Sequence, residues 1–493
     1  MFCRGVSNTM FFQPFFYFYL FFSTLKEEKG TLSFKIQKKN MVLRRSLFCS
    51  HYYKSSSTSC WRRRTFATSH NNKITKKNEA FSIYIHWPYC ESKCTYCNFN
   101  KYVNPSDPPV ERLTRAMIRE LEFYLSEPRF GVLHNKRVTS IYFGGGTPSL
   151  AKPSTISRIL QTVNQHISLD KDIEITLEAN PTSSELARLR DFRDAGINRL
   201  SLGIQSFNDV DLKLLGRDHS ASSAIRTLEE AKKLFPEVTF DMIFARPRQS
   251  LEDWQRELKQ TLDLAGNHLS MYQLSFERGT PLWKFMRKGQ IGSVDPELAA
   301  DMYEETVRAA THHGFTHYEV SSYAKSRDAI SAHNFSYWQG LDYIGIGPGA
   351  HGRLTDNVTK ERIRTFGEFH PDRYMALCES EGEGIRKWSP LSPHDSLQEL
   401  VVFGLRTRMG IPRYRYKKMT GQDLENVIDR EFLDMCVRSN FLIVDNDDRN
   451  KSDILPYIPK HLEHEWEQGG IRPTEQGLER MDSILPKLLH LKQ

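Results

Sequence analysis

The sequence predicts an α/β protein, in which an open, partial parallel β/α barrel is joined to a small, mainly helical C-terminal domain. Two observations lead to this fold class. From residue 80 onward, short apolar segments with strand character alternate with amphipathic helical segments, the pattern of βαβ units around a parallel sheet. The alternation stops after six or seven units, too few for the eight of a closed barrel.

The elements follow from the spacing of apolar residues. Alternating or continuous apolar runs predict strands, and apolar positions three and four apart predict helices. The expected strands are 81–87, 138–143, 173–177, 199–204, 238–244 and 269–276, and the helices between them are 108–127, 153–167, 184–195, 221–235 and 251–265. A helix over 296–313 and a strand over 318–322 then lead to a glycine-rich segment ending near Arg353.

The last hundred residues have a different pattern. Helices are expected at 397–408, 421–435 and 474–490 with one strand at 441–444, an arrangement resembling a winged helix. Such helices serve recognition, docking, simple packing or closure of the barrel as a lid. We divide the chain into a leader, a linker, a partial barrel, a connecting segment with two further motifs, and a C-terminal domain: 1–66, 67–79, 80–325, 326–394 and 395–493.

The positive charge of the chain lies in its leader. Of 68 basic and 60 acidic residues, residues 1–66 hold twelve and two, which leaves 56 against 58 in the rest. The body is close to neutral, so the excess does not indicate a nucleic-acid partner. With 39% hydrophobic and 26% charged residues, the composition excludes a wholly disordered chain and a polytopic membrane protein.

The leader has the composition of an organellar transit peptide. From Met41 it is rich in Arg and Ser, and Arg64 to Thr68 resembles a mitochondrial matrix-processing site with cleavage after Phe66. Residues 1–40 then form an extension upstream of a start at Met41. The aromatic run 10–22 is shorter than the roughly 20 apolar residues of a membrane span, so no stable span is expected in the mature protein. A chloroplast transit peptide and a merely basic tail are the alternatives.

Three cysteines follow the first strand directly. Cys90, Cys94 and Cys97 lie within eight positions, in a loop opened by Pro88. Three thiolates can hold three irons of a [4Fe–4S] cluster and leave the fourth iron for an exogenous ligand. A structural zinc site needs four protein ligands, and the nearest fourth candidate, His86, lies on the preceding strand. Zinc and chance clustering remain as alternatives at this point.

The cysteine spacing, with Tyr96 just before the last cysteine, resembles the signature of radical S-adenosylmethionine (SAM) proteins. In that family the open iron binds the amino and carboxylate groups of SAM, and reductive cleavage yields a 5′-deoxyadenosyl radical. The segment 144–149 resembles the family's glycine motif, which implies that Gly145, Gly146 and Thr147 lie against the cofactor. Glycines allow such close approach of the main chain, although a plain strand-to-helix turn has the same composition.

From 81 to 489 the chain is similar to the oxygen-independent coproporphyrinogen III oxidases and their relatives, the HemN/HemW group. The resemblance implies further cofactor contacts, with the Glu178 carboxylate holding the ribose hydroxyls of SAM. Taken singly, such charged residues are more simply surface or capping groups, but their placement after successive strands favours a site. The implied contacts are Tyr84, Glu178, Gln205, Arg217, Asp241, Ser275 and His351.

Two features separate the branches of this group. The oxidases carry a fourth cysteine two residues after the third, and Phe99 stands there in this chain. The His-Asn-x-x-Tyr-Trp motif that begins at His333 is typical of the HemW branch. It makes His333, Tyr337 and Trp338 haem candidates, because an imidazole can ligate haem iron and aromatic rings suit a porphyrin face. A satisfied histidine beside a buried aromatic pair is the alternative.

Two segments are left open by the sequence. The spacing of Gly347, Gly349 and Gly352 formally matches a dinucleotide fingerprint, but no βαβ unit begins there. Where relatives usually have Gly-Leu-Pro-Gly, this chain has Ala-Arg-Pro-Arg over 245–248. Arg246 and Arg248 either bind porphyrin propionates or weaken the binding of SAM.

The resemblance implies a haem chaperone that binds haem as cargo, a [4Fe–4S] cluster and SAM, and delivers haem to acceptor proteins in the mitochondrial matrix. It implies a reductant for the cluster as a further partner. Two alternatives remain: an enzyme that oxidises the propionates of coproporphyrinogen III by radical hydrogen abstraction, and a degenerate module that binds SAM without cleaving it.

Overall fold

The computed structural model describes residues 80–103, 105–130, 133, 136–446 and 455–489. The predicted leader and linker therefore lie outside the described residues. Within these ranges, no helix is both long enough and apolar enough to cross a lipid bilayer.

A twelve-stranded open sheet forms the centre of the molecule, with the strand order β14-β13-β12-β11-β1-β4-β5-β6-β7-β8-β10-β9. Parallel pairing joins β11 to β1 and continues without a break from β1 to β8. These strands are β1 (Ala80–Trp87), β4 (Arg137–Gly145), β5 (Glu174–Ala179), β6 (Arg199–Gln205), β7 (Glu237–Phe244), β8 (His268–Gln273) and β11 (Asp342–Ile346). The prediction of an open, partial parallel barrel is confirmed.

Both edges of the sheet end in antiparallel strands, which prevents closure into a barrel. At one edge β10 (Ser322–Ala324) and β9 (Thr316–Glu319) follow β8. At the other edge β12 (His351–Thr355), β13 (Arg362–Gly367) and β14 (Ile385–Pro390) extend from β11. The segment 326–394 thus supplies four strands to the main sheet, which the glycine-rich pattern did not predict.

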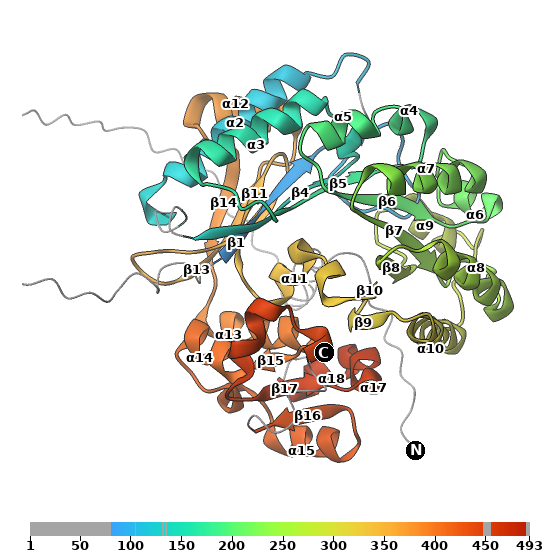
Figure 1. Ribbon diagram of the computed structural model, residues 1–493, viewed down its shortest axis with the longest axis vertical. Helices are drawn as coiled ribbons and strands as arrows, with labels where there is room; N and C mark the ends of the chain where they lie inside the picture. Colours follow the sequence, from blue (N-terminus) through green and yellow to red (C-terminus); the bar gives the residue numbers. More distant parts are fainter. Residues whose placement is uncertain (1–79, 104, 131–132, 134–135, 447–454, 490–493) are drawn as a thin grey trace, which may run out of the picture.

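Amphipathic helices cover the outer face of the sheet (Figure 1). In α2, for example, Leu113, Met117 and Leu121 point inward and are fully buried. Such a stripe at intervals of four residues is the surface that a helix packs against a sheet. The main covering helices are α2 (Val110–Ser126), α3 (Pro153–His166), α7 (Ala221–Leu234), α8 (Leu251–Leu264) and α10 (Pro296–His312).

The helix predicted over 184–195 is instead broken into α4 (Ser183–Leu186) and α5 (Leu189–Asp194). Arg188, at the break, donates hydrogen bonds to the carbonyl oxygens of Ser149 and Ala151. The chain is therefore drawn toward the β4–α3 turn, where a continuous helix would carry it past.

The C-terminal domain has its own small sheet and its own apolar core. The sheet pairs β15 (Ile411–Pro412) and β16 (Leu442–Asp445) on either side of β17 (Gly470–Pro473). Its helices are α13 (Pro393–Leu405), α14 (Arg413–Thr420), α15 (Arg430–Arg438), α17 (Glu475–Glu479) and α18 (Met481–Leu488). The helix predicted over 421–435 begins only at Arg430, and the one over 474–490 is divided at Arg480.

One short helix connects the two domains. α11 (Ala332–Trp338) lies inside the curve of the main sheet, against β4 and β1 on one side and α13 on the other (Figure 1). The haem-candidate motif is on this helix.

Candidate cofactor cleft

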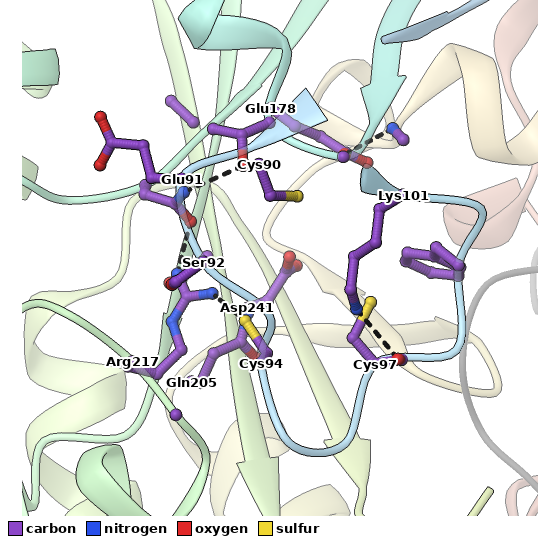
Figure 2. Close-up of a pocket in the computed structure, with 18 of the residues that line it drawn as sticks. Cys90, Glu91, Ser92, Cys94, Cys97, Lys101, Glu178, Gln205, Arg217 and Asp241 are labelled. Carbon is purple, nitrogen blue, oxygen red and sulfur yellow. Dashed lines mark hydrogen bonds between the residues drawn. The ribbon is translucent and has the colours of Figure 1, made fainter. Parts of the chain in front are cut away.

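A cleft opens at the carboxyl ends of the parallel strands, where the sequence analysis places the site. It encloses about 940 Å³ of space, a volume that includes open solvent at its mouth. The predicted residues that line it are Cys90, Cys94, Tyr96, Cys97, Gly145, Gly146, Thr147, Glu178, Gln205, Arg217 and Asp241. Residues from five strand ends and the cysteine loop thus meet in one place (Figure 2).

The cysteine loop is hydrogen-bonded to the C-terminal end of α6 (Asp209–Leu214) and to the residue that follows it. The Thr95 backbone N–H donates to the Leu215 carbonyl at 3.0 Å, and the Thr95 hydroxyl donates to the Leu214 carbonyl at 2.7 Å. Tyr96 is buried in an apolar cluster that includes Leu215 and Ile243. The conformation of the loop is therefore set by the fold and not by a ligand alone.

Two cations flank the cysteines. Arg217 donates to the Cys94 sulfur at 3.1 Å, and the Lys101 ammonium donates to the Cys97 carbonyl at 2.9 Å (Figure 2). Burial raises the pKa of the Cys90 thiol to about 11, although a hydrogen bond with Thr147 and the charge of Lys101 act in the opposite direction. The site therefore favours thiolates that are stabilised by a bound cation, which a cluster would supply.

The donor set fits an iron–sulfur cluster. Among the described residues, no three His, Cys, Asp or Glu side chains converge as ligands of a single metal ion. A [4Fe–4S] cluster does not need ligands that converge on one ion, because each of three irons binds its own thiolate. Cys90, Cys94 and Cys97 face the same cleft from separate points of one loop, as that spacing requires (Figure 2).

The glycine turn after β4 and the Glu178 carboxylate form the opposite wall. Gly145 has a φ of +109°, and a Cβ on Gly146 would lie 2.6 Å from the Tyr89 carbonyl oxygen, so neither position accommodates a side chain. The Gly145 N–H donates to Glu178 Oε2 at 3.2 Å, and the Tyr142 hydroxyl donates to Glu178 Oε1 at 2.8 Å. The carboxylate is thus fixed from two directions at the rim of the cleft.

Several polar atoms of the cleft lack a protein partner. Among the described side chains, Gln205 Oε1 and Arg217 Nε are buried without a hydrogen bond, and Gln205 also has a φ of +73°. Burial and the nearby Glu178 raise the pKa of Asp241 to about 8, against the lowering effects of Arg217 and Ser270. Unpaired polar atoms, a strained backbone and a shifted pKa in one cleft are typical of a ligand site.

Three predicted cofactor contacts do not line the cleft. Tyr84 lies one layer behind Glu178, with its hydroxyl 3.1 Å from His86 Nδ1. His351 packs edge-on against Phe366 at 4.9 Å, and burial lowers its pKa to about 4. Ser275 lies beyond the end of β8 and outside the cleft lining. Which face of a strand end turns toward the cleft depends on sheet twist, which the motif spacing does not report.

Other cleft residues were not singled out from the sequence. Lys101, Asn180, Ser201 and Tyr272 all line the cleft. Asn180 lies two residues after Glu178, directly beyond the end of β5, and accepts a hydrogen bond from Arg217. Its position just beyond a strand end was the available signal.

The haem-candidate motif is buried and internally paired. His333 is only 1% exposed, with Nδ1 2.9 Å from the Ser140 hydroxyl and Nε2 2.6 Å from the Tyr337 hydroxyl. Burial lowers the pKa of His333 to about 3, so the ring is neutral. Trp338 packs edge-on against Phe403. In this conformation both ring nitrogens of His333 are occupied, whereas the Trp338 indole nitrogen is buried without a hydrogen-bond partner.

The two arginines of segment 245–248 face away from the cleft. Arg246 is buried and forms ion pairs with Asp211 at 3.0 Å and with Glu257, while it also donates to the Ile243 carbonyl at 2.6 Å. Arg248 is exposed. Arg246 therefore stands where relatives usually have leucine and forms a buried structural link to α6, and neither arginine lines the cofactor cleft.

The fold and the cleft together define an open-barrel protein with a three-cysteine loop, and comparison with known proteins identifies the class. Residues 84–260 match the model of the radical SAM superfamily. The chain is 39% identical to the mitochondrial radical SAM domain-containing protein 1 of Danio rerio, over 85% of this chain and 89% of that protein. It is 33% identical to the heme chaperone HemW of Haemophilus influenzae, over 74% and 92%.

The chain therefore belongs to the radical SAM superfamily, within the HemN/HemW group. Its fold is also that of the coproporphyrinogen III oxidase HemN from Escherichia coli, with a TM-score of 0.64 and 20% identity over 84% of this chain and 90% of that one. At this identity the match concerns the fold alone. Membership in the superfamily implies a [4Fe–4S] cluster and SAM as cofactors.

Proposed function

We propose that this protein is a haem chaperone of the HemW type, which binds a [4Fe–4S] cluster and SAM in the cleft and hands haem to acceptor proteins. The observation that carries the proposal is Phe99, which lines the cleft where the oxidase branch has its fourth cysteine. The relatives named as heme chaperones support the same assignment.

In this proposal Cys90, Cys94 and Cys97 hold the cluster, and Lys101 and Arg217 offset its negative charge. A bound and reduced cluster would supply an electron to SAM. The glycine turn at 145–147, which lines the cleft, would hold the amino group of SAM with its backbone.

The remaining cleft residues orient the nucleotide. Glu178 accepts hydrogen bonds from the ribose hydroxyls, because its carboxylate lines the cleft and is held there by Tyr142 and the Gly145 N–H. Gln205 and Asp241 offer further polar contacts at the same wall. Arg217 links this wall to the cluster loop through its hydrogen bonds to Cys94 and Asn180.

The haem site is proposed at the motif of α11. Ligation of haem iron by His333 requires one ring nitrogen to lose its partner, Ser140 or Tyr337, and the buried ring to become accessible, so α11 must rearrange when haem binds. Tyr337 and Trp338 would then present flat apolar surface to the porphyrin.

We place the protein in the mitochondrial matrix, with a chloroplast destination as the alternative. The basic, acid-poor segment after Met41 supports an organellar address, and relatives from fish, cattle and mouse are named as mitochondrial. The partners in this compartment are a reductant for the cluster and haem-accepting proteins.

One experiment separates the chaperone from the oxidase. The protein is reconstituted anaerobically and incubated with SAM, dithionite and coproporphyrinogen III, and a parallel sample is titrated with hemin. We expect a saturable hemin spectrum and no protoporphyrinogen. Substantial protoporphyrinogen formation would make the protein an oxidase, and measurement of 5′-deoxyadenosine in the same sample shows whether SAM is cleaved at all.

The haem ligand is tested on the same material. Hemin titration of His333→Ala is compared with wild type and with His268→Ala, a buried histidine elsewhere in the sheet. Loss of hemin binding in the first variant alone supports His333 as the ligand. Equal binding by all three proteins excludes it.

A further inference from the structure

A column of aromatic and polar side chains lies beneath the wall of the cleft. Tyr142 points from β4 toward Glu178, and its ring stacks on the His333 imidazole with centroids 4.6 Å apart and planes inclined by 21°. The Tyr84 ring lies against both, with its centroid 6.2 Å from that of Tyr142 and 6.3 Å from that of His333. The column thus connects α11 to the carboxylate that faces the cleft.

The imidazole is held in one orientation by hydrogen bonds at both nitrogens. Ser140, two residues before Tyr142 on the same face of β4, pairs with Nδ1, and Tyr337 pairs with Nε2. A ring fixed at two points offers a fixed surface to the Tyr142 ring. The Tyr142 hydroxyl, at the far end of that ring, donates to Glu178 Oε1 at 2.8 Å.

A second link joins the same elements. Glu174 and Glu178 lie four residues apart on β5, and therefore on the same face of the strand. Glu174 accepts hydrogen bonds from the backbone N–H groups of Ala332 and His333, at 3.0 and 2.9 Å. One end of β5 thus holds the start of α11, while the other end presents Glu178 to the cleft.

We propose that His333 is a positioning residue for the nucleotide site: acting through Tyr142, it holds the Glu178 carboxylate in place for the ribose hydroxyls of SAM. The inference rests on the proposed function in one respect, the binding of SAM in the cleft. It gives the α11 motif a role in the conformation in which both His333 ring nitrogens are paired, independent of iron ligation. It also means that withdrawal of His333 from this column, as haem ligation requires, weakens the hold on SAM.

The test measures SAM affinity rather than turnover. Equilibrium dialysis of the anaerobically reconstituted full chain gives the Kd of wild type, His333→Ala, Tyr142→Phe and Glu178→Gln. We expect Glu178→Gln to have the largest effect, about tenfold or more, and the other two to raise the Kd about three- to tenfold, a range set by the loss of one hydrogen bond of ordinary strength.

The chain provides a matched control in His268. This buried imidazole is also held between two hydroxyls, Thr239 at Nδ1 and Tyr318 at Nε2, both at 2.8 Å, but no contact joins it to Glu178. His268→Ala makes the same truncation in a comparable setting, and we expect it to leave the Kd of SAM unchanged. An equal weakening in both variants would reduce the effect to general loss of packing and would overturn the inference.

Two further readouts separate positioning from a merely structural role. In the double variant His333→Ala/Tyr142→Phe, the two effects should not add, because both act through one hydrogen bond. The 2′-deoxyribose analogue of SAM should bind wild type less tightly than SAM does, whereas His333→Ala should discriminate less between the two. Additive effects, or unchanged discrimination, would refute the role.

The outcomes remain distinguishable from those for the proposed function. If wild type binds no SAM, the proposed cofactor site fails. If wild type binds SAM and His333→Ala binds it equally well, only the present inference fails. Should His333→Ala not fold, as circular dichroism and a melting curve will show, Tyr142→Phe removes only one hydroxyl and decides the question.

Discussion

The cofactor cleft and the α11 column share two strands, β4 and β5, yet they differ in whether their buried polar atoms have partners. In the cleft, Gln205 Oε1 and Arg217 Nε are buried without protein partners. In the column, both ring nitrogens of His333 are paired. Buried polar atoms without a hydrogen bond lower the stability of the fold unless a ligand pairs with them, whereas paired polar atoms do not carry this cost. Substitutions in the two regions should therefore differ in whether they affect binding or folding.

The largest effect is expected at the cysteine loop. Cys94→Ala should abolish cluster assembly, because three thiolates are the minimum that hold a [4Fe–4S] cluster at three irons. Iron content and visible absorption after anaerobic reconstitution measure this, with the melting temperature of the apoprotein expected to stay near that of wild type. Cys436→Ala, a buried cysteine of the C-terminal domain, is the control and should retain full iron. Normal iron content in Cys94→Ala would exclude the assigned ligand set.

The next effect concerns a buried charge that serves the fold alone. Arg246→Leu should destabilise the protein by about 3–5 kcal/mol, because it leaves the Asp211 and Glu257 carboxylates without their buried cation. Chemical denaturation of the apoprotein measures the change. Arg248→Leu, two residues away and exposed, should change stability by less than about 0.5 kcal/mol. Similar behaviour of the two variants would show that the ion-pair cluster does not support the fold.

Arg246 also shows where sequence reasoning ends. The strands and the cleft were predictable because apolar runs identify parallel strands and the carboxyl ends of such strands share one edge. The pairing of His333 with Ser140 was not, since these residues are 193 positions apart and neither is unusual alone. The sequence also did not indicate that Arg246 points toward Asp211 and Glu257, because each of these acidic residues lies on a helix among many exposed residues. The local pattern of apolar residues thus predicts where a strand ends, whereas packing between residues far apart in the sequence determines which side chains point into the cleft.

The pH dependence of stability tests whether Asp241, a cleft residue, has a protonated carboxyl in the folded protein. The pKa of Asp241, raised to about 8, means that the native state keeps a proton on this carboxyl where the unfolded chain has lost it. Stability contributed by this proton is present at low pH and is lost as the pH rises between about 4 and 8. Asp241→Asn should therefore lose less melting temperature over this range than wild type, while its affinity for SAM falls about tenfold.

The exposed Asp301 provides the control for that comparison. Asp301→Asn should leave both the pH profile and SAM binding unchanged. A wild-type slope in Asp241→Asn would show that some other group titrates, and unimpaired SAM binding would place Asp241 outside the cofactor contacts. Either outcome would count against the view that polar groups of the cleft serve ligand binding while those of the α11 column stabilise the fold.

The smallest effect is expected from a single cation at the cluster. The Lys101 ammonium lies against the Cys97 carbonyl inside the cleft, where it favours addition of an electron to an anionic cluster. Lys101→Met should make the reduction of the cluster less favourable by about 1 kcal/mol, which shifts its midpoint potential to more negative values by roughly 40 mV for one electron. A redox titration followed by electron paramagnetic resonance measures this shift. Lys93→Met removes the same charge from an exposed position of the same loop, where solvent screens it, and should shift the potential much less. Because neither lysine supports the core, melting temperatures should not separate the two variants. Equal shifts in potential would mean that the cleft does not shield its charges from solvent.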